Sequence, residues 1–276
     1  MMWANIQNIN TMMNAPPKPR HPEAPAPGEE VMYVDMTRER LEDLYNEDKK
    51  WYIKGVAIRP LMKIFLDTAD TDVIREYFET GLVDGVTTNP TLIMKSGKNP
   101  EDVYQEIKDI GVKDISMEVM GNFVEMYTEG SRLSQKFGDV CTVKVPCTRE
   151  GLKVCKALSD EGVKVNVTLI FCAAQAVLAA KAGATYVSPF VGRLDDQSVA
   201  GLEVVRSISE LYRVHGVRTK VLSASIRSVQ RAIRSWYNGA EICPMPPKVF
   251  DQMYDHILTD KGMEIFENDW ESVKKW

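Results

Sequence analysis

The chain has 276 residues and a formal net charge of −5, and 44% of its residues are hydrophobic and 26% charged. This is ordinary globular composition, and the length suits one large α/β domain with a sizeable core. The acidic balance argues against a nucleic-acid-binding protein, which usually presents a basic face. The longest apolar runs are too short and too often interrupted to cross a bilayer. We therefore expect no nucleic-acid partner and no membrane segment.

The five cysteines form no CxxC pair, and the N-terminus has no basic stretch followed by an apolar one. A secreted protein usually pairs its cysteines and begins with such a signal. The pattern is typical of free thiols in a reducing compartment, so we expect a cytoplasmic protein.

The first 61 residues differ from the rest. Residues 15–29, "APPKPRHPEAPAPGE", are proline-rich and are expected to be extended and largely disordered, whereas residues 36–50 are expected to form one short helix. A strong strand pattern follows Met62 at once. We therefore expect an N-terminal extension over residues 1–61 and a catalytic domain over residues 62–276, with Met62 a candidate start of translation.

From residue 63 onward, strand-like runs alternate with helix-like stretches. Strands are expected over residues 63–69, 85–90, 114–120, 141–146, 164–170, 186–190, 220–225 and 241–246. Helices are expected over residues 71–80, 100–110, 123–137, 149–161, 172–182, 198–215, 228–238 and 247–257. This alternation implies parallel strands joined by helical crossovers. Eight such units suit a closed (β/α)8 TIM barrel better than an open sheet, and no GxGxxG motif follows the first strand.

Polar or ionisable side chains recur near the C-terminal ends of seven consecutive predicted strands, where a TIM barrel keeps its active site. Side-chain alternation along each strand places them on one face. In chain order they are Asp67, Thr87 with Asn89, Ser116 with Glu118, Thr142 with Lys144, Asn166 with Thr168, Ser188 (beside Phe190), and Ser223 with Ser225. Singly, each has an ordinary explanation as a core hydroxyl, helix cap or turn residue. Together they indicate one cavity.

Lys144 lies between two valines in a run that otherwise reads as a buried strand. Taken alone, it could extend outward past the helices. Burying it beside Asp67 and Glu118 without a use would reduce stability. A partly desolvated lysine becomes a nucleophilic amine, and its attack on a ketone gives an iminium ion that accepts electrons from a neighbouring C–C bond. Two carboxylates could share the proton transfers.

Such chemistry needs no cofactor. The three histidines, His21, His215 and His256, fall in separate predicted segments, so no metal-ligand cluster is visible. Arg193, in the loop after the sixth strand, and Arg227, at the start of the helix after the seventh, lie where such barrels often bind phosphate. The guanidinium fork suits phosphate. We therefore expect sugar-phosphate substrates and neither metal nor cofactor.

Seven motifs resemble, in order, those of the transaldolase family, most closely its short subfamily, which also contains fructose-6-phosphate aldolase. They are "FLDTAD", "GVTTNPTL", "SMEVM", "VKVPCTREG", "NVTLIFCAAQA", "AGATYVSPFVGR" and "LSASIR", and they extend through the predicted catalytic domain. The resemblance implies a (β/α)8 barrel and class I aldol chemistry, in which an enzyme lysine carries a dihydroxyacetone unit.

The resemblance also implies roles for single residues. Lys144 matches the Schiff-base lysine, and Asp67 the aspartate that handles the proton of the substrate C4 hydroxyl. Glu118 matches the glutamate that forms and breaks the carbinolamine through a water held by Thr168. Asn89 and Asn166 match amides that hold the dihydroxyacetone hydroxyls. The substrate-binding positions, expected from this match or from the shared strand face, are Thr87, Asn89, Ser116, Asn166, Ser188, Phe190, Arg193, Ser225 and Arg227.

Two positions bear on the activity. As the family is known, its aldolase branch carries glutamine in place of Glu118 and tyrosine in place of Phe190, so this chain resembles the transferase type. We predict a transaldolase of the pentose phosphate pathway, which moves dihydroxyacetone from fructose 6-phosphate or sedoheptulose 7-phosphate to erythrose 4-phosphate or glyceraldehyde 3-phosphate. The alternatives are a fructose-6-phosphate aldolase, which releases free dihydroxyacetone, and a catalytically silent barrel that serves as a scaffold.

The resemblance further implies a homo-oligomer, for which the short subfamily suggests a decamer of stacked pentamers. The C-terminal segment "GMEIFENDWESVKKW" carries Ile265, Phe266 and Trp270 on an apolar face. Such a face suits packing on a neighbouring copy, and packing on its own barrel equally well.

Overall fold

The computed structural model describes residues 52–53, 56–57 and 62–274. The chain divides into two units, Met1–Pro60 and Leu61–Trp276. In the first unit, strand β1 (Tyr52–Ile53) pairs antiparallel with β2 (Val56–Ala57). The expected proline-rich segment and the expected helix over residues 36–50 lie outside the described residues.

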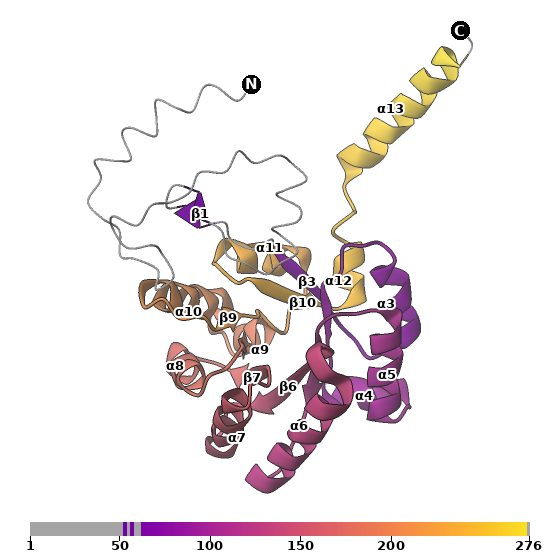
Figure 1. Ribbon diagram of the computed structural model, residues 1–276. Coiled ribbons are helices and arrows are strands. Elements are labelled where there is room, and N and C mark those ends of the chain that lie inside the picture. Colours follow the sequence, from indigo (N-terminus) through magenta and orange to yellow (C-terminus); the bar gives the residue numbers. More distant parts are fainter. Residues whose placement is uncertain (1–51, 54–55, 58–61, 275–276) are drawn as a thin grey trace. The chain divides into compact units, whose positions relative to one another are not determined.

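Eight parallel strands form the sheet of the second unit, in the order β10-β3-β4-β5-β6-β7-β8-β9 (Figure 1). They are β3 (Lys63–Asp67), β4 (Gly85–Thr87), β5 (Ile115–Glu118), β6 (Cys141–Pro146), β7 (Val165–Ile170), β8 (Tyr186–Pro189), β9 (Lys220–Val221) and β10 (Ile242–Met245). A bridge between Leu222 and Ile242, with the Ser223 amide 2.9 Å from the Ile242 carbonyl oxygen, brings the two edges together. The predicted (β/α)8 barrel is confirmed.

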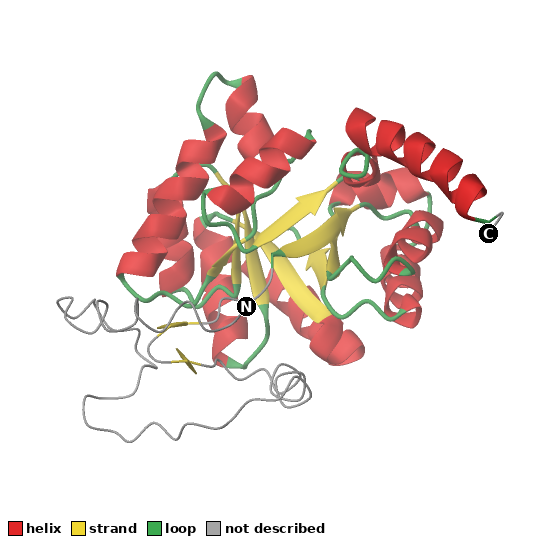
Figure 2. Cartoon of the chain, turned by 90° about the horizontal axis from the view of Figure 1, so that it is seen from above, coloured by secondary structure: helices red, strands yellow, loops and turns green. Residues whose placement is uncertain are grey.

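Helices surround these strands, as the red and yellow elements of Figure 2 show. They are α3 (Thr71–Phe78), α4 (Pro90–Ser96), α5 (Pro100–Ile110), α6 (Phe123–Phe137), α7 (Arg149–Asp160), α8 (Ala173–Lys181), α9 (Val191–Asp196), α10 (Gly201–Val214), α11 (Val229–Tyr237), α12 (Pro247–Asp251) and α13 (Ile257–Val273). Local sequence sets their ends. Asn122 and Glu125 form a capping box at the start of α6, and Gly111 ends α5 with a left-handed φ of 106°.

Three helix predictions differ from the structure. Helix α4 was not expected; Asn89 caps it by accepting the Leu92 amide, and Pro90 suits its first turn. The segment after β8 forms the separate helix α9, so Arg193 lies in a helix and not in a loop. The helix expected over residues 247–257 ends at Asp251, and a separate helix, α13, begins after His256, whose backbone is extended and whose side chain accepts the Leu258 amide.

The packing of β6 fixes the direction of the lysine. Helix α6 crosses the outer face of this strand so closely that a Cβ on Gly130 would lie 3.0 Å from Val143 Cγ1. Val143 and Val145 are fully buried in the layer between strands and helices. Alternation along the strand therefore turns Lys144 into the barrel.

Helix α13 differs from the other long helices, because its described residues include no buried one. Its exposed apolar side chains are Ile257, Leu258, Met263, Ile265, Phe266, Trp270 and Val273. The alternative that this segment packs on its own barrel is therefore not observed. None of the helices in the described part of the chain combines the length and the apolar character that a membrane span requires.

Candidate active site

A cavity of about 130 Å³ opens at the C-terminal end of the barrel. The nine predicted site residues that line it are Asp67, Thr87, Asn89, Lys144, Asn166, Ser188, Phe190, Arg193 and Ser225. They come from β3, β4, β6, β7 and β8 and from the segments that follow β4, β8 and β9. Residues more than 150 positions apart in the sequence thus reach one space, as expected for the strand ends of this fold.

Lys144 is held at two points. Its Nζ lies 3.0 Å from Glu118 Oε2 and donates to the Thr88 carbonyl oxygen at 3.0 Å. The Lys144 and Glu118 side chains are only 7% and 9% exposed. Strand register places the two residues side by side on β6 and β5. The amine is therefore fixed in position next to a carboxylate that can exchange a proton with it.

Asp67 lies on β3, two strands from β5 in the sheet order. Its Oδ1 accepts a hydrogen bond of 2.7 Å from Thr87 Oγ1. Burial raises the pKa of the Asp67 carboxyl above its ordinary value, and this effect outweighs the opposing pull of the Lys144 charge and the Thr87 hydrogen bond. A carboxyl with a raised pKa is suited to giving and taking protons.

Three polar side chains, two of which line the cavity, form a continuous hydrogen-bonded line. Asn166 donates through Nδ2 to Ser116 Oγ at 3.2 Å, and Ser188 Oγ donates to Asn166 Oδ1 at 2.7 Å. All three residues are essentially buried. The line fixes the Asn166 amide in one orientation beside Lys144, its strand neighbour in the β6–β7 register.

Strand β7 is strained where it leaves the barrel. Leu169 has φ 58°, and the pairing with β8 shifts register between Val167 and Ile170. A bulky residue rarely adopts this left-handed conformation, and such strain gathers at functional sites. The residue before it, Thr168, is buried, and its Oγ1 has no hydrogen-bond partner among the described residues. Among the predicted site residues, Thr168 is the one whose buried hydroxyl has no hydrogen-bond partner in the described part of the chain.

The strand alternation predicted for residues 220–225 is wrong by one position. Leu222 and Ala224 line the cavity, whereas Ser223 turns outward and its Oγ lies 2.9 Å from Ser235 Oγ of α11. Ser225 still reaches the cavity because its backbone is left-handed, with φ 60°. This conformation breaks the alternation on which the prediction depended.

The two arginines at the rim differ in their surroundings. The Arg193 guanidinium lies over the Phe190 ring, 4.9 Å from its centroid, and Arg193 lines the cavity. Arg227 lies outside that lining and makes a two-pronged ion pair with Asp196, at 2.5 and 2.7 Å. Of the predicted site residues, Arg227 is thus the one that the structure pairs away from the cavity.

Sequence reasoning missed two contributors. The Thr88 carbonyl that holds Lys144 is a backbone group, and no side-chain pattern could have revealed it. Asp196 drew no prediction, because its partner Arg227 lies 31 positions away in the sequence.

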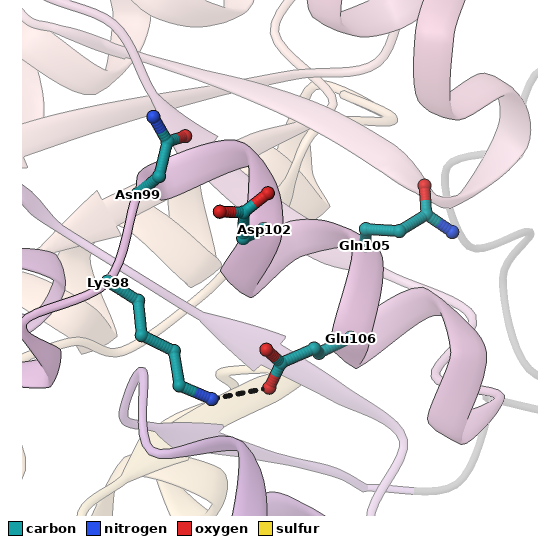
Figure 3. A pocket seen from close by; sticks show the side chains of 5 residues that line it. All are labelled: Lys98, Asn99, Asp102, Gln105 and Glu106. Atoms are coloured by element: carbon teal, nitrogen blue, oxygen red, sulfur yellow. Dashed lines mark hydrogen bonds and ion pairs between the residues drawn. The ribbon is translucent and has the colours of Figure 1, made fainter.

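A wider surface hollow of about 470 Å³ surrounds the start of α5, lined by Lys98, Asn99, Asp102, Gln105 and Glu106. In Figure 3, Lys98 and Glu106 point toward each other, and their ion pair measures 2.6 Å. The paired Lys98 and Glu106 side chains are 43% and 40% exposed, so they are not buried groups in need of a use. The hollow lacks the converging buried groups of the barrel cavity. In the described residues, no three His, Cys, Asp or Glu side chains are grouped to hold a metal ion.

Comparisons with known proteins agree with this geometry. The profile described as "Transaldolase/Fructose-6-phosphate aldolase" matches residues 64–276. A "Probable transaldolase" of Paracoccus denitrificans is 50% identical over 210 residues, which are 76% of this chain and 96% of that protein. Proteins of the same description match in Caulobacter vibrioides (49% over 213 residues; 77% and 98%) and Nitrosopumilus maritimus (47% over 215 residues; 77% and 96%). The chain belongs to the transaldolase/fructose-6-phosphate aldolase family.

Proposed function

We propose that the protein is a transaldolase in which Lys144 carries a dihydroxyacetone unit as a Schiff base. The observation that supports this best is the buried Lys144 amine, fixed between Glu118 and the Thr88 carbonyl at the base of an open cavity. Relatives about 50% identical carry the description "Probable transaldolase". The assignment of each step below to a residue is part of the proposal.

The first step is attack of Lys144 on the substrate ketone. Glu118 takes a proton from the Lys144 ammonium, and the freed lone pair on Nζ forms a bond to the carbonyl carbon. Glu118 passes that proton to the carbonyl oxygen and takes a second proton from the nitrogen, giving a neutral carbinolamine. Glu118 then returns a proton to the carbinolamine hydroxyl, which leaves as water, and the iminium ion forms. The free Thr168 hydroxyl is suited to hold that water. Glu118 ends the step in the protonation state in which it began.

The second step breaks the C3–C4 bond of the ketose phosphate. Asp67 takes the proton of the C4 hydroxyl, the C4–O bond becomes a carbonyl, and the electrons of the C3–C4 bond move into the iminium. The first aldose phosphate leaves, and the dihydroxyacetone unit stays on Lys144 as an enamine. The raised pKa of Asp67 supports this role, because it keeps the protonated form accessible for the return step to the acceptor aldehyde.

Two features favour transfer over release of dihydroxyacetone. Release needs water to protonate the enamine, and Phe190 presents an apolar ring at the cavity where a hydroxyl would help to activate water. Arg193 on the same wall supplies a cation for the phosphate of an incoming aldose. We therefore infer sugar-phosphate donors and acceptors of the pentose phosphate pathway.

Trapping tests the covalent step and its location. Borohydride added with fructose 6-phosphate should reduce the iminium and leave a dihydroxyacetone-derived mass on the peptide that contains Lys144. A label on Lys164, the lysine next along the chain, with Lys144 unmodified would rule the mechanism out. Parallel assays with and without an acceptor aldehyde separate the two activities, since cleavage at equal rates in both would favour the aldolase.

We also infer a cytoplasmic homo-oligomer. All five cysteines are free thiols, which suits a reducing compartment. Helix α13 has no buried residue in its described part and exposes Ile265, Phe266 and Trp270, a surface that a second copy of the chain would cover. Sedimentation of the full chain and of an Ile265→Asp variant tests this. An unchanged oligomer in the variant would remove α13 from the interface.

A further inference from the structure

We propose that Asp196 sets the strength of sugar-phosphate binding by competing with the substrate phosphate for Arg227. The inference rests on the proposed function, since it concerns an arginine that we assign to the phosphate. Both terminal nitrogens of Arg227 are engaged: Nη1 lies 2.5 Å from Asp196 Oδ1, and Nη2 lies 2.7 Å from Oδ2. A guanidinium binds phosphate through the same parallel pair of donors. The carboxylate therefore occupies the groups that a phosphate would use.

Arg193 shows that this arrangement is not a general property of the rim. Its guanidinium lies over the Phe190 ring and faces the cavity, and within the described residues it forms no ion pair. One rim cation is thus available to an anion from the start. The other, Arg227, must first release the Asp196 carboxylate.

The guanidinium end of Arg227 lies against the first turn of α9. A Cβ on Gly192 would lie 2.8 Å from Arg227 Nε, so the arginine crosses the first turn of α9 in direct contact with the glycine. Asp196 is the last residue of this helix. Helix α9 therefore both borders the arginine side chain and supplies its competing carboxylate.

The Arg227–Asp196 pair is weak enough to be displaced. Its two side chains are 54% and 48% exposed, and exposed ion pairs contribute little net free energy. A phosphate dianion offers more charge and more acceptors than a carboxylate. An acceptor without phosphate cannot displace Asp196, so it gains nothing from Arg227. Competition of this kind acts on phosphorylated substrates alone.

An Asp196→Asn variant tests the competition, because it keeps the side-chain shape and removes the charge. We expect KM for fructose 6-phosphate and the inhibition constant of inorganic phosphate both to fall about two- to fivefold, the range of an exposed pair. We expect kcat to stay unchanged. KM for unphosphorylated glyceraldehyde as acceptor should also stay unchanged. A rise in KM for fructose 6-phosphate would show that Asp196 orients Arg227 and would overturn the proposal.

Two further variants separate competition from a general charge effect. Asp195→Asn removes a neighbouring charge that pairs with Arg231 instead, at 3.1 Å, and it should leave KM for fructose 6-phosphate within twofold of wild type. In an Arg227→Ala background, Asp196→Asn should have no effect on KM. An equal fall in KM for both aspartate variants, or a fall that persists without Arg227, would overturn the proposal.

The outcome also distinguishes this inference from the function on which it rests. If the wild-type protein forms no borohydride-trapped adduct with fructose 6-phosphate, the proposed function itself is wrong. If the adduct forms and Arg227→Ala raises KM, but Asp196→Asn leaves KM unchanged, the function stands and the role of Asp196 falls.

Discussion

The two ends of the barrel interior contain the same kinds of groups in opposite circumstances. At the N-terminal end, Asp114 accepts hydrogen bonds from Thr142 Oγ1 (2.8 Å) and Tyr186 OH (2.7 Å) and lies 3.6 Å from the Lys164 ammonium. At the C-terminal end, Asp67 has one hydroxyl partner and faces a cavity. Strand β6 supplies Thr142 to one end and Lys144 to the other. A buried carboxylate therefore does not by itself indicate a functional site. A buried carboxylate whose negative charge has few polar partners to stabilise it does.

Replacing the lysine tests the reactive end most severely. Lys144→Ala should reduce turnover by at least about a thousandfold, because Lys144 is the one lysine among the described residues that line the cavity. Steady-state assays with fructose 6-phosphate and an acceptor measure this, and far-UV circular dichroism checks the fold. Activity near wild type would show that Lys144 is not required, and the C-terminal end of the barrel could then not be called the reactive one.

Replacing Asp67 with asparagine tests whether its poorly stabilised negative charge is needed for function. Asp67→Asn should lower kcat by about 10²- to 10⁴-fold, the range of a lost general acid or base.

The same substitution should also stabilise the fold at neutral pH. Because burial raises the pKa of Asp67 in the folded state, the folded chain binds more protons than the unfolded chain between the ordinary pKa of about 3.9 and the raised value. Wild-type stability therefore falls as pH rises through that window.

Thermal unfolding at two pH values measures this difference. The gain in melting temperature of Asp67→Asn over wild type should be present at pH 7 and should disappear below about pH 3.9, where both forms of the protein carry a neutral group. A gain of equal size at both pH values would show that the substitution acts through packing and not through charge.

At the other end, removing Asp114 should harm stability and spare catalysis. Asp114→Ala leaves the Thr142 and Tyr186 hydroxyls without this acceptor, which should reduce the free energy of unfolding by about 2–4 kcal/mol. Urea denaturation measures the loss, and kcat should be retained. Asp114→Asn keeps one acceptor and should lose less. A large fall in kcat with little loss of stability would make the two ends functionally alike.

At the rim, the two arginines should differ in the size of their effects. Arg193→Ala should raise KM for phosphorylated substrates about ten- to hundredfold, from the loss of charge-assisted hydrogen bonds. Arg227→Ala should raise it less, because Arg227 must first release Asp196. Arg193→Lys, which keeps the charge without the fork, should fall between wild type and Arg193→Ala. Equal effects of the two alanine variants would contradict the asymmetry.

Much of this fold and of the cavity could be predicted from the sequence, because the underlying signals are local. The alternation of strands and helices predicted the barrel, and side-chain alternation along "CTVKVP" predicted an inward Lys144. The same rule failed between Ser223 and Ser225, which do not share a face, since Ser225 has a left-handed backbone that nothing in the sequence marks. A serine carries no preference for that conformation.

Groups that act through the backbone or through distant pairing could not be predicted. The Thr88 carbonyl reaches Lys144 across 56 positions of sequence. The ion pair between Asp196 and Arg227 depends on where α9 ends relative to β9. The helix α9 itself was expected as a loop, because six residues are too few for a helical pattern to stand out from its surroundings.

The close contact at Gly192 limits how this enzyme could be adapted to new acceptors. A side chain there would lie 2.4 Å from the Ser225 carbonyl oxygen, which is backbone and cannot move aside as a flexible side chain would. The wall formed by α9 and the segment after β9 is therefore closed to enlargement or reshaping at this point. Laboratory evolution toward longer or branched aldehydes should accumulate its substitutions on the opposite wall, around Asn89 and the start of α4.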